Sequence, residues 1–157
     1  MKTYRILIAA GALALGAGAA APAFAAAPAV ALKGDVKVIR QVTENGKITE
    51  KLEEPSQVLP GDQLVFTTRY TNGGTEPATD FVVTNPLPGP VKLAKVNGFE
   101  VSVDGGKTFG ALAALKAAGT DGKPRAAELG DVTHVRWRVA SIAPGASGEV
   151  KYFAEVR

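Results

Sequence analysis

The side chains best suited to chemistry lie together on one short predicted strand near the C-terminus. His134, Arg136 and Arg138 alternate with apolar residues there, so we expect all three on the outward face of the strand. A histidine can act as a general base, and arginines can bind an acidic glycan or an acidic protein. His134 is the only histidine, the chain has no cysteine, and His134 lacks an obvious nucleophile partner of the triad type, so we expect no catalytic or metal site. Two arginines form a weak patch, and a face kept polar for solubility is the simpler interpretation of this candidate interaction face.

A second candidate is the turn sequence SVDGGKTF, which fits the Asp-box pattern S-x-D-x-G-x-T-[FW] of sialidase-like propellers. Its key positions are Ser102, Asp104, Gly106 and Phe109. We expect Asp104 to accept hydrogen bonds from nearby backbone N–H groups, and Phe109 to pack beneath the turn. A propeller needs several such boxes at blade spacing, and this chain has one. The pattern therefore predicts a structural turn, and a hydrolase is the weaker alternative.

Acidic residues near the predicted turns could bind calcium if the fold brought them together. They lack the dense D-x-D-x-D spacing of a calcium-binding loop, and turn chemistry accounts for each of them equally well. We therefore expect neither a metal ion nor a cofactor. The residues in question are Asp62, Asp80, Asp104, Asp121 and Asp131.

Residues 1–25 have the three parts of a secretory signal peptide. Lys2 and Arg5 form a basic start, and an uncharged apolar run follows over residues 6–21. The sequence Ala-Phe-Ala then supplies a small-x-small site, so we expect cleavage between Ala25 and Ala26. This segment predicts that the chain is exported and that it is secreted, periplasmic or at the cell surface.

The rest of the chain divides into a predicted flexible leader over residues 26–34 and one domain over residues 35–157. An uncleaved membrane anchor is the alternative to cleavage. Pro22 and Pro28 interrupt the alanine-rich run, however, and alanine is only marginally apolar, so a spanning helix would be poor. We expect no transmembrane segment once the signal peptide is removed.

Charge and cysteine content narrow the function classes. The chain has 18 Lys and Arg against 15 Asp and Glu, and the predicted signal peptide contains two of the cations and no acid. The mature part then has 16 against 15, a net charge of +1, whereas a nucleic-acid-binding domain normally carries a clear basic excess. The absence of cysteine excludes disulfides and a lipid-modified N-terminal cysteine. These features favour a cysteine-free exported domain of a bacterial envelope, with no nucleic-acid partner.

Alternating apolar and polar residues, separated by strong turn signals, predict an all-β domain. Residues 35–54 hold two charged arms around Asn45-Gly46, which is the strongest short-range hairpin signal because both residues tolerate positive φ. The many Lys and Glu residues in these arms predict an exposed edge hairpin. Further strands are expected over residues 63–71, 78–84, 91–96, 99–103, 134–139 and 149–156, with a second Asn-Gly turn between the third and fourth of them.

Residues 110–130 are ambiguous. The sequence ALAALKAA could form about two helical turns, since alanine and leucine are good helix formers. The stretch over residues 119–124 reads as a mobile loop. Trp137 is the expected core anchor, and Tyr70 and Tyr152 also face inward by alternation.

Four segments carry a resemblance to a known family. PGDQLVFTTRYTNGG, ATDFVVTNPLP, VSVDGGKTFG and VRWRVASIAPGASGEVKYFAEV together resemble the bacterial and archaeal "conserved repeat" domain of unknown function. This is an immunoglobulin-like module of surface and secreted proteins, and the similarity spans residues 58–156. Asn85-Pro86 stands where the family often has an aspartate before its Leu-Pro turn, and no internal repeat occurs. The resemblance implies a non-catalytic envelope module and names no ligand.

The sequence as a whole predicts an immunoglobulin-like antiparallel β-sandwich of about seven to nine strands, preceded by a signal peptide. Its expected role is structural or in protein interaction, and its expected partner is a protein or another envelope component. Self-association through edge strands is one form that this interaction could take. A glycan-binding or adhesin module is the alternative. Aromatic residues make up only 6% of the chain, and exposed aromatics are what a glycan site needs.

Overall fold

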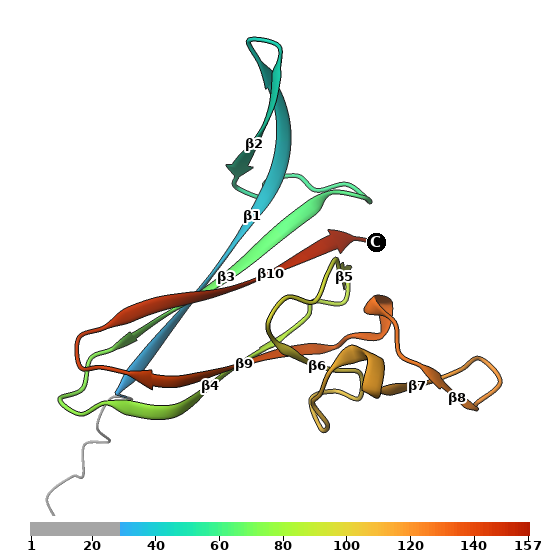
Figure 1. Cartoon of the computed structure of the whole chain (residues 1–157). Helices are drawn as coiled ribbons and strands as arrows, with labels where there is room; N and C mark the ends of the chain where they lie inside the picture. Colours follow the sequence, from blue (N-terminus) through green and yellow to red (C-terminus); the bar gives the residue numbers. More distant parts are fainter. Residues whose placement is uncertain (1–28) are drawn as a thin grey trace, which may run out of the picture.

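Ten β-strands and two short 3₁₀ helices build residues 29–157, the part of the chain that this computed structural model describes (Figure 1). The sheets are antiparallel, which confirms the prediction of an all-β chain. The predicted signal peptide, with its cleavage site between Ala25 and Ala26, lies outside the described residues. The elements are β1 (Val30–Glu44), β2 (Lys47–Glu53), β3 (Gln63–Asn72), β4 (Ala78–Pro86), β5 (Val91–Leu93), β6 (Glu100–Ser102), η1 (Leu112–Ala114), β7 (Lys116–Ala118), β8 (Pro124–Ala126), η2 (Leu129–Asp131), β9 (His134–Ile142) and β10 (Ser147–Val156).

Two sheets carry most of the strands. The larger sheet has the order β2-β1-β3-β10-β5, and the smaller one has the order β4-β9-β6. β9 and β10 follow each other in the chain but belong to different sheets, and the turn between them uses Gly145 at a φ of 73°. β7 and β8 form a separate two-stranded ribbon that extends from one end of the molecule in Figure 1.

Both larger sheets contribute side chains to one hydrophobic core. The period-2 alternation in β9 and β10 buries Trp137, which is 9% exposed, and Tyr152, which is 2% exposed. The Tyr152 ring stacks on that of Phe66 with centroids 4.7 Å apart, and the Trp137 ring lies 5.1 Å from that of Phe99. These contacts confirm the inward positions expected for Trp137 and Tyr152, while Tyr70 packs partly buried against the same cluster.

The first strand is longer than the sequence suggests. β1 begins at Val30 and pairs with β3 from Val30 opposite Asn72 to Ile39 opposite Gln63. The prediction of a flexible leader over residues 26–34 is therefore wrong for residues 30–34. The alanine- and proline-rich sequence that leads into it concealed this strand, whose backbone bonds to β3 do not depend on side-chain burial: Leu32 is 53% exposed.

Residues 91–103 do not form the two long strands that we expected. β5 pairs with β10 and β6 pairs with β9, so the chain crosses from one sheet to the other through Asn97-Gly98. Gly98 adopts a φ of 70°. Each strand is only three residues long because each one leaves its sheet after burying a few apolar side chains, among them Leu93 and Val101.

The two helical turns that the ambiguous residues 111–118 could have formed are absent from the described chain. Only Leu112–Ala114 forms a 3₁₀ turn, and β7 follows directly. A pair of backbone bonds joins Gly110 to Val101, and the Ala127 N–H donates to the Leu115 carbonyl. These bonds and the packing of Leu115 against the core outweigh the helix propensity of a short alanine-rich run.

The predicted N-terminal hairpin is confirmed. β1 and β2 pair from Val38 opposite Glu53 up to Glu44 opposite Lys47. Asn45 and Gly46 turn the chain with φ values of 52° and 76°, as a two-residue hairpin turn requires. Figure 1 shows this hairpin rising beyond the two sheets, away from the core.

Candidate functional site

The side chains of Ser102 and Asp104 form a set of local hydrogen bonds in the turn after β6. The Asp104 carboxylate accepts from the Thr108 N–H at 2.9 Å and from the Ser102 hydroxyl at 2.7 Å. The Ser102 oxygen in turn accepts from the Gly106 N–H at 2.9 Å. The Thr108 N–H and the Ser102 hydroxyl hold the pKa of Asp104 well below its usual range. These local bonds agree with a structural turn, since they occupy the carboxylate that a catalytic role would need.

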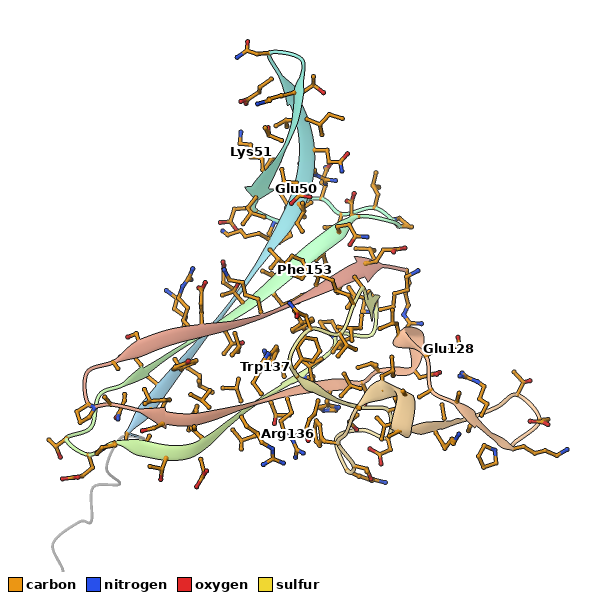
Figure 2. The ribbon with its side chains drawn as sticks, viewed as in Figure 1. Glu50, Lys51, Glu128, Arg136, Trp137 and Phe153 are labelled. Carbon is orange, nitrogen blue, oxygen red and sulfur yellow. The ribbon has the colours of Figure 1, made fainter. Side chains whose placement is uncertain are left out.

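The face that carries His134, Arg136 and Arg138 is not a free cationic strip. The Arg136 guanidinium lies 4.0 Å above the ring of Phe109 and also contacts Glu100 at 2.8 Å. Arg138 reaches the same Glu100 carboxylate at 3.4 Å. Figure 2 shows Trp137 directed toward the space between the sheets, with Arg136 on the opposite face of β9.

Glu100 is the residue of this face that the sequence interpretation missed. It lies directly opposite Arg136 in the β6–β9 pairing, and Arg136 lowers the pKa of its carboxyl most strongly. One carboxylate shared by two arginines halves the positive charge of this face. Only the strand register brings Glu100 next to Arg136, and a single sequence does not specify that register.

His134 lies half-buried beside the turn after β6. Its Nδ1 is 3.1 Å from the Thr133 hydroxyl, and its ring meets that of Phe109 edge-on, with centroids 6.5 Å apart. Gly106 also lies close to the imidazole. These neighbours pack the ring between two turns.

The acidic residues considered for calcium lie apart: Asp80 lies within β4, and the other four lie in or beside separate turns. Asp131 pairs with Arg125 at 2.6 Å, and Asp121 accepts from the Lys123 N–H at 3.1 Å. Asp62 and Asp104 each serve a turn of their own. Within residues 29–157, no group of three or more His, Cys, Asp and Glu side chains could hold a metal ion.

The β1–β2 hairpin presents the most unusual surface among the described residues. All seven residues of β2 are exposed, including the apolar Ile48 at 70% and Leu52 at 57%. β2 is also the outermost strand of the larger sheet, so one edge of its backbone has no neighbouring strand in the described chain. The sequence places this hairpin at an edge, but its apolar pair does not stand out among so many charges.

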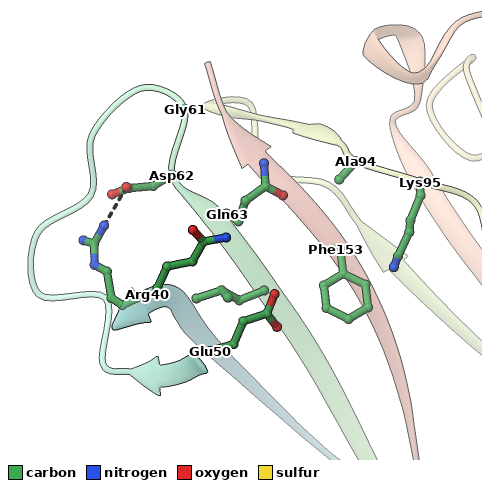
Figure 3. Close-up of a pocket in the computed structure, with 10 residues that line it drawn as sticks. Arg40, Glu50, Gly61, Asp62, Gln63, Ala94, Lys95 and Phe153 are labelled. Carbon is green, nitrogen blue, oxygen red and sulfur yellow. Dashed lines mark hydrogen bonds and ion pairs between the residues drawn. The ribbon is translucent and has the colours of Figure 1, made fainter. Parts of the chain in front are cut away.

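Polar contacts fix the base of the hairpin to the rest of the sheet. The Arg40 guanidinium donates to the Asp62 carboxylate at 2.6 Å and to the Gln57 carbonyl at 3.0 Å, as Figure 3 shows for the first of these bonds. Asp62 also accepts from the Leu59 N–H at 2.8 Å. That backbone bond, followed by Arg40, lowers the pKa of Asp62.

A shallow groove of about 620 Å³ lies beside this base on the outer face of the larger sheet (Figure 3). It runs from Glu50 of β2 across Gln63 to Phe153 of β10. The ammonium group of Lys95 lies 4.5 Å from the centre of the Phe153 ring at the far side. The groove extends the exposed surface of the hairpin onto the sheet.

Comparison with protein-family models, with curated proteins and with solved structures found no match to this chain. Within residues 29–157, no helix is long and apolar enough to cross a membrane.

Proposed function

We propose that this chain is an exported, non-catalytic β-sandwich of the immunoglobulin-like kind that binds a protein of the cell envelope through its β1–β2 hairpin. The tripartite N-terminal segment supports export, and the resemblance to the "conserved repeat" domain supports the immunoglobulin-like class. One observation carries the binding role: a strand of seven exposed residues, two of them large and apolar, lies at an open sheet edge.

β2 has the properties of a binding strand. An open edge offers unpaired backbone N–H and C=O groups, and a partner strand can satisfy them by β-augmentation. Ile48 and Leu52 would then supply alternate side-chain contacts on one face of the strand. Exposed apolar side chains of this size add favourable burial only when something covers them.

Two alternative functions lack such a feature. A glycan site needs exposed aromatic rings, whereas Trp137 and Tyr152 are buried in the core. A hydrolase built on the Asp-box turn would need a free carboxylate, whereas Asp104 Oδ1 accepts three bonds from its own turn.

Site-specific photocrosslinking in bacteria that express the full chain tests the binding role. A photoreactive amino acid at Thr49 of β2 is compared with the same group at Thr79, an exposed threonine on the edge strand β4. We expect a crosslinked product from position 49 and none from position 79. A product from 79 alone, or from neither site, would contradict the proposal.

Deleting the hairpin, residues 35–53, would be a poor test of the binding role, because the deletion also removes Val38, which is 1% exposed in the core. The matched variant is Ile48→Thr with Leu52→Thr, which keeps β-forming residues and removes the apolar contacts. It should abolish the crosslink from position 49.

Mass spectrometry of the exported chain should find Ala26 at its N-terminus, and an intact residue 1 in the exported protein would overturn the signal-peptide assignment.

A further inference from the structure

The register of the hairpin determines which backbone groups of β2 face its open edge. The Glu44 carbonyl and the Lys47 N–H close the two-residue turn, so these two residues form a hydrogen-bonded pair. Such pairs alternate along antiparallel strands. Residues 47, 49, 51 and 53 therefore bond to β1, and residues 48, 50 and 52 direct their N–H and C=O groups away from it.

These three outward residues are centred on Glu50, and this position creates a symmetric pairing. If a second β2 strand lies antiparallel with Glu50 opposite Glu50, then Ile48 of each copy lies opposite Leu52 of the other. Every outward N–H and C=O group of residues 48, 50 and 52 then finds a partner in hydrogen-bonded pairs. The same arrangement places an apolar pair at each end of the contact.

The charges on the opposite face of β2 fit the same register. Lys47 lies opposite Glu53 of the second copy, and Glu53 lies opposite its Lys47, while Thr49 faces Lys51. Two attractive charge pairs therefore flank two Thr–Lys pairs, in which no charge lies directly opposite another.

Neighbouring registers lose this complementarity. A shift of two residues in one direction sets Lys51 opposite Lys51 and Ile48 opposite Glu54. A shift in the other direction sets Lys47 opposite Lys51 and Ile48 opposite Glu50. A one-residue shift sets residues whose backbone groups face the open edge opposite residues whose groups bond to β1. It also exchanges the two side-chain faces of the strand.

We propose that β2 pairs with β2 of a second copy of this chain, in an antiparallel register centred on Glu50. This inference rests on the proposed function, because it names the partner of the open hairpin edge. The bodies of the two copies would lie at opposite ends of the joined hairpins, since the strands are antiparallel and each hairpin rises away from its own body (Figure 1).

The one pair of like charges directly opposite each other in this β2–β2 contact is formed by the two Glu50 side chains. Like charges directly opposite each other destabilise a strand pair. Replacing Glu50 with Gln, a neutral side chain of nearly the same shape, should therefore tighten the dimer several-fold. Only this register sets the two Glu50 side chains opposite each other.

Sedimentation of the purified mature chain, over concentrations up to about 1 mM, tests the register. We expect reversible dimers of the wild type, and dimerisation about tenfold weaker for Lys47→Glu and for Glu53→Lys alone. An equimolar mixture of these two variants should dimerise again, because every charge pair in the mixed dimer is attractive. Lys51→Glu is the matched control, because it makes the same charge change as Lys47→Glu at a position opposite a threonine. Its dimer dissociation constant should stay within about threefold of the wild-type value.

Two results would overturn the proposal: a wild type that stays monomeric over this range, or variants whose mixture does not recover. A monomeric protein that still crosslinks in cells from position 49 to a different protein would refute self-pairing and leave the proposed function standing. A monomer without any crosslink from position 49 would remove both.

Discussion

At the scale of single residues, polar side chains in this protein serve turns and strand ends. Asp104 shows this most clearly, because three bonds from its own turn converge on one carboxylate. In a protein with several Asp-box turns, these residue types would suggest a hydrolase. In this chain they hold a single loop in place.

The lowered pKa of Asp104 has a consequence for stability. Its pKa is lower in the folded than in the unfolded chain, so its contribution is fully present above the unfolded value of about 3.9 and is lost as the pH falls toward the folded value. We predict that Asp104→Asn lowers the Tm at pH 7. The difference from wild type should shrink below about pH 4, and thermal unfolding at a series of pH values measures it. A difference that grows on acidification would contradict this role.

Asn72 provides a second prediction, because its side chain is fully buried at the end of β3. Its amide donates to the carbonyls of Glu76 and Ile142, each at 2.9 Å, and its oxygen accepts from the Gly74 N–H at 3.0 Å. Asn72→Ala leaves these groups unpaired and should reduce the free energy of unfolding by about 2 to 4 kcal/mol.

The control for this experiment is the neighbouring Thr71, whose side chain is exposed. Thr71→Ala should change the free energy of unfolding by less than about 1 kcal/mol. Urea titration of both variants makes the comparison. Equal losses would show that the bonds of Asn72 do not stabilise the fold.

At the scale of elements, alternation determines which face of each strand enters the core. β4 offers a direct test, since Val83 is 0% exposed and Val82, the residue before it, is 41% exposed. Val83→Ala should reduce the free energy of unfolding by about 2 kcal/mol or more, and Val82→Ala by less than about 1 kcal/mol. Denaturant unfolding checks both, and the reverse order would mean that β4 faces the other way.

The strands that the sequence predicts well are those with clear alternation or a strong turn. β9 and β10 alternate around Trp137 and Tyr152, and Asn45-Gly46 marks the hairpin. All three depend on residues close together in the chain. The type of element over residues 111–118 was not predictable in the same way, because distant backbone bonds from Val101 and Ala127 decide it.

The candidate sites divide in the same way: contacts between residues close in the chain could be predicted, and contacts between distant residues could not. The bonds of Asp104 are local and could be predicted from a single turn sequence. The pairing of Arg136 with Glu100 could not, because 36 residues separate them and only the sheet register brings them together. The exposure of Ile48 and Leu52 was hidden for a related reason: alternation alone does not reveal that a strand lies beyond the edge of the core.

At the scale of the whole molecule, a stable body carries an exposed hairpin. The core lies between the two larger sheets, and the outer part of the hairpin adds no buried side chain to it. Ile48→Thr with Leu52→Thr should therefore change the free energy of unfolding by less than about 1 kcal/mol while removing binding. A large loss of stability, seen by thermal unfolding, would show that the hairpin supports the fold.

Residue-resolved amide exchange of the mature chain tests the central claim most directly, because it reports on each N–H group of β2 separately. In dilute solution the amides of Thr49 and Lys51 should be protected more than those of Ile48, Glu50 and Leu52, which face the open edge. On assembly, the latter three should gain protection together. Assembly that leaves these three amides unchanged would contradict the account.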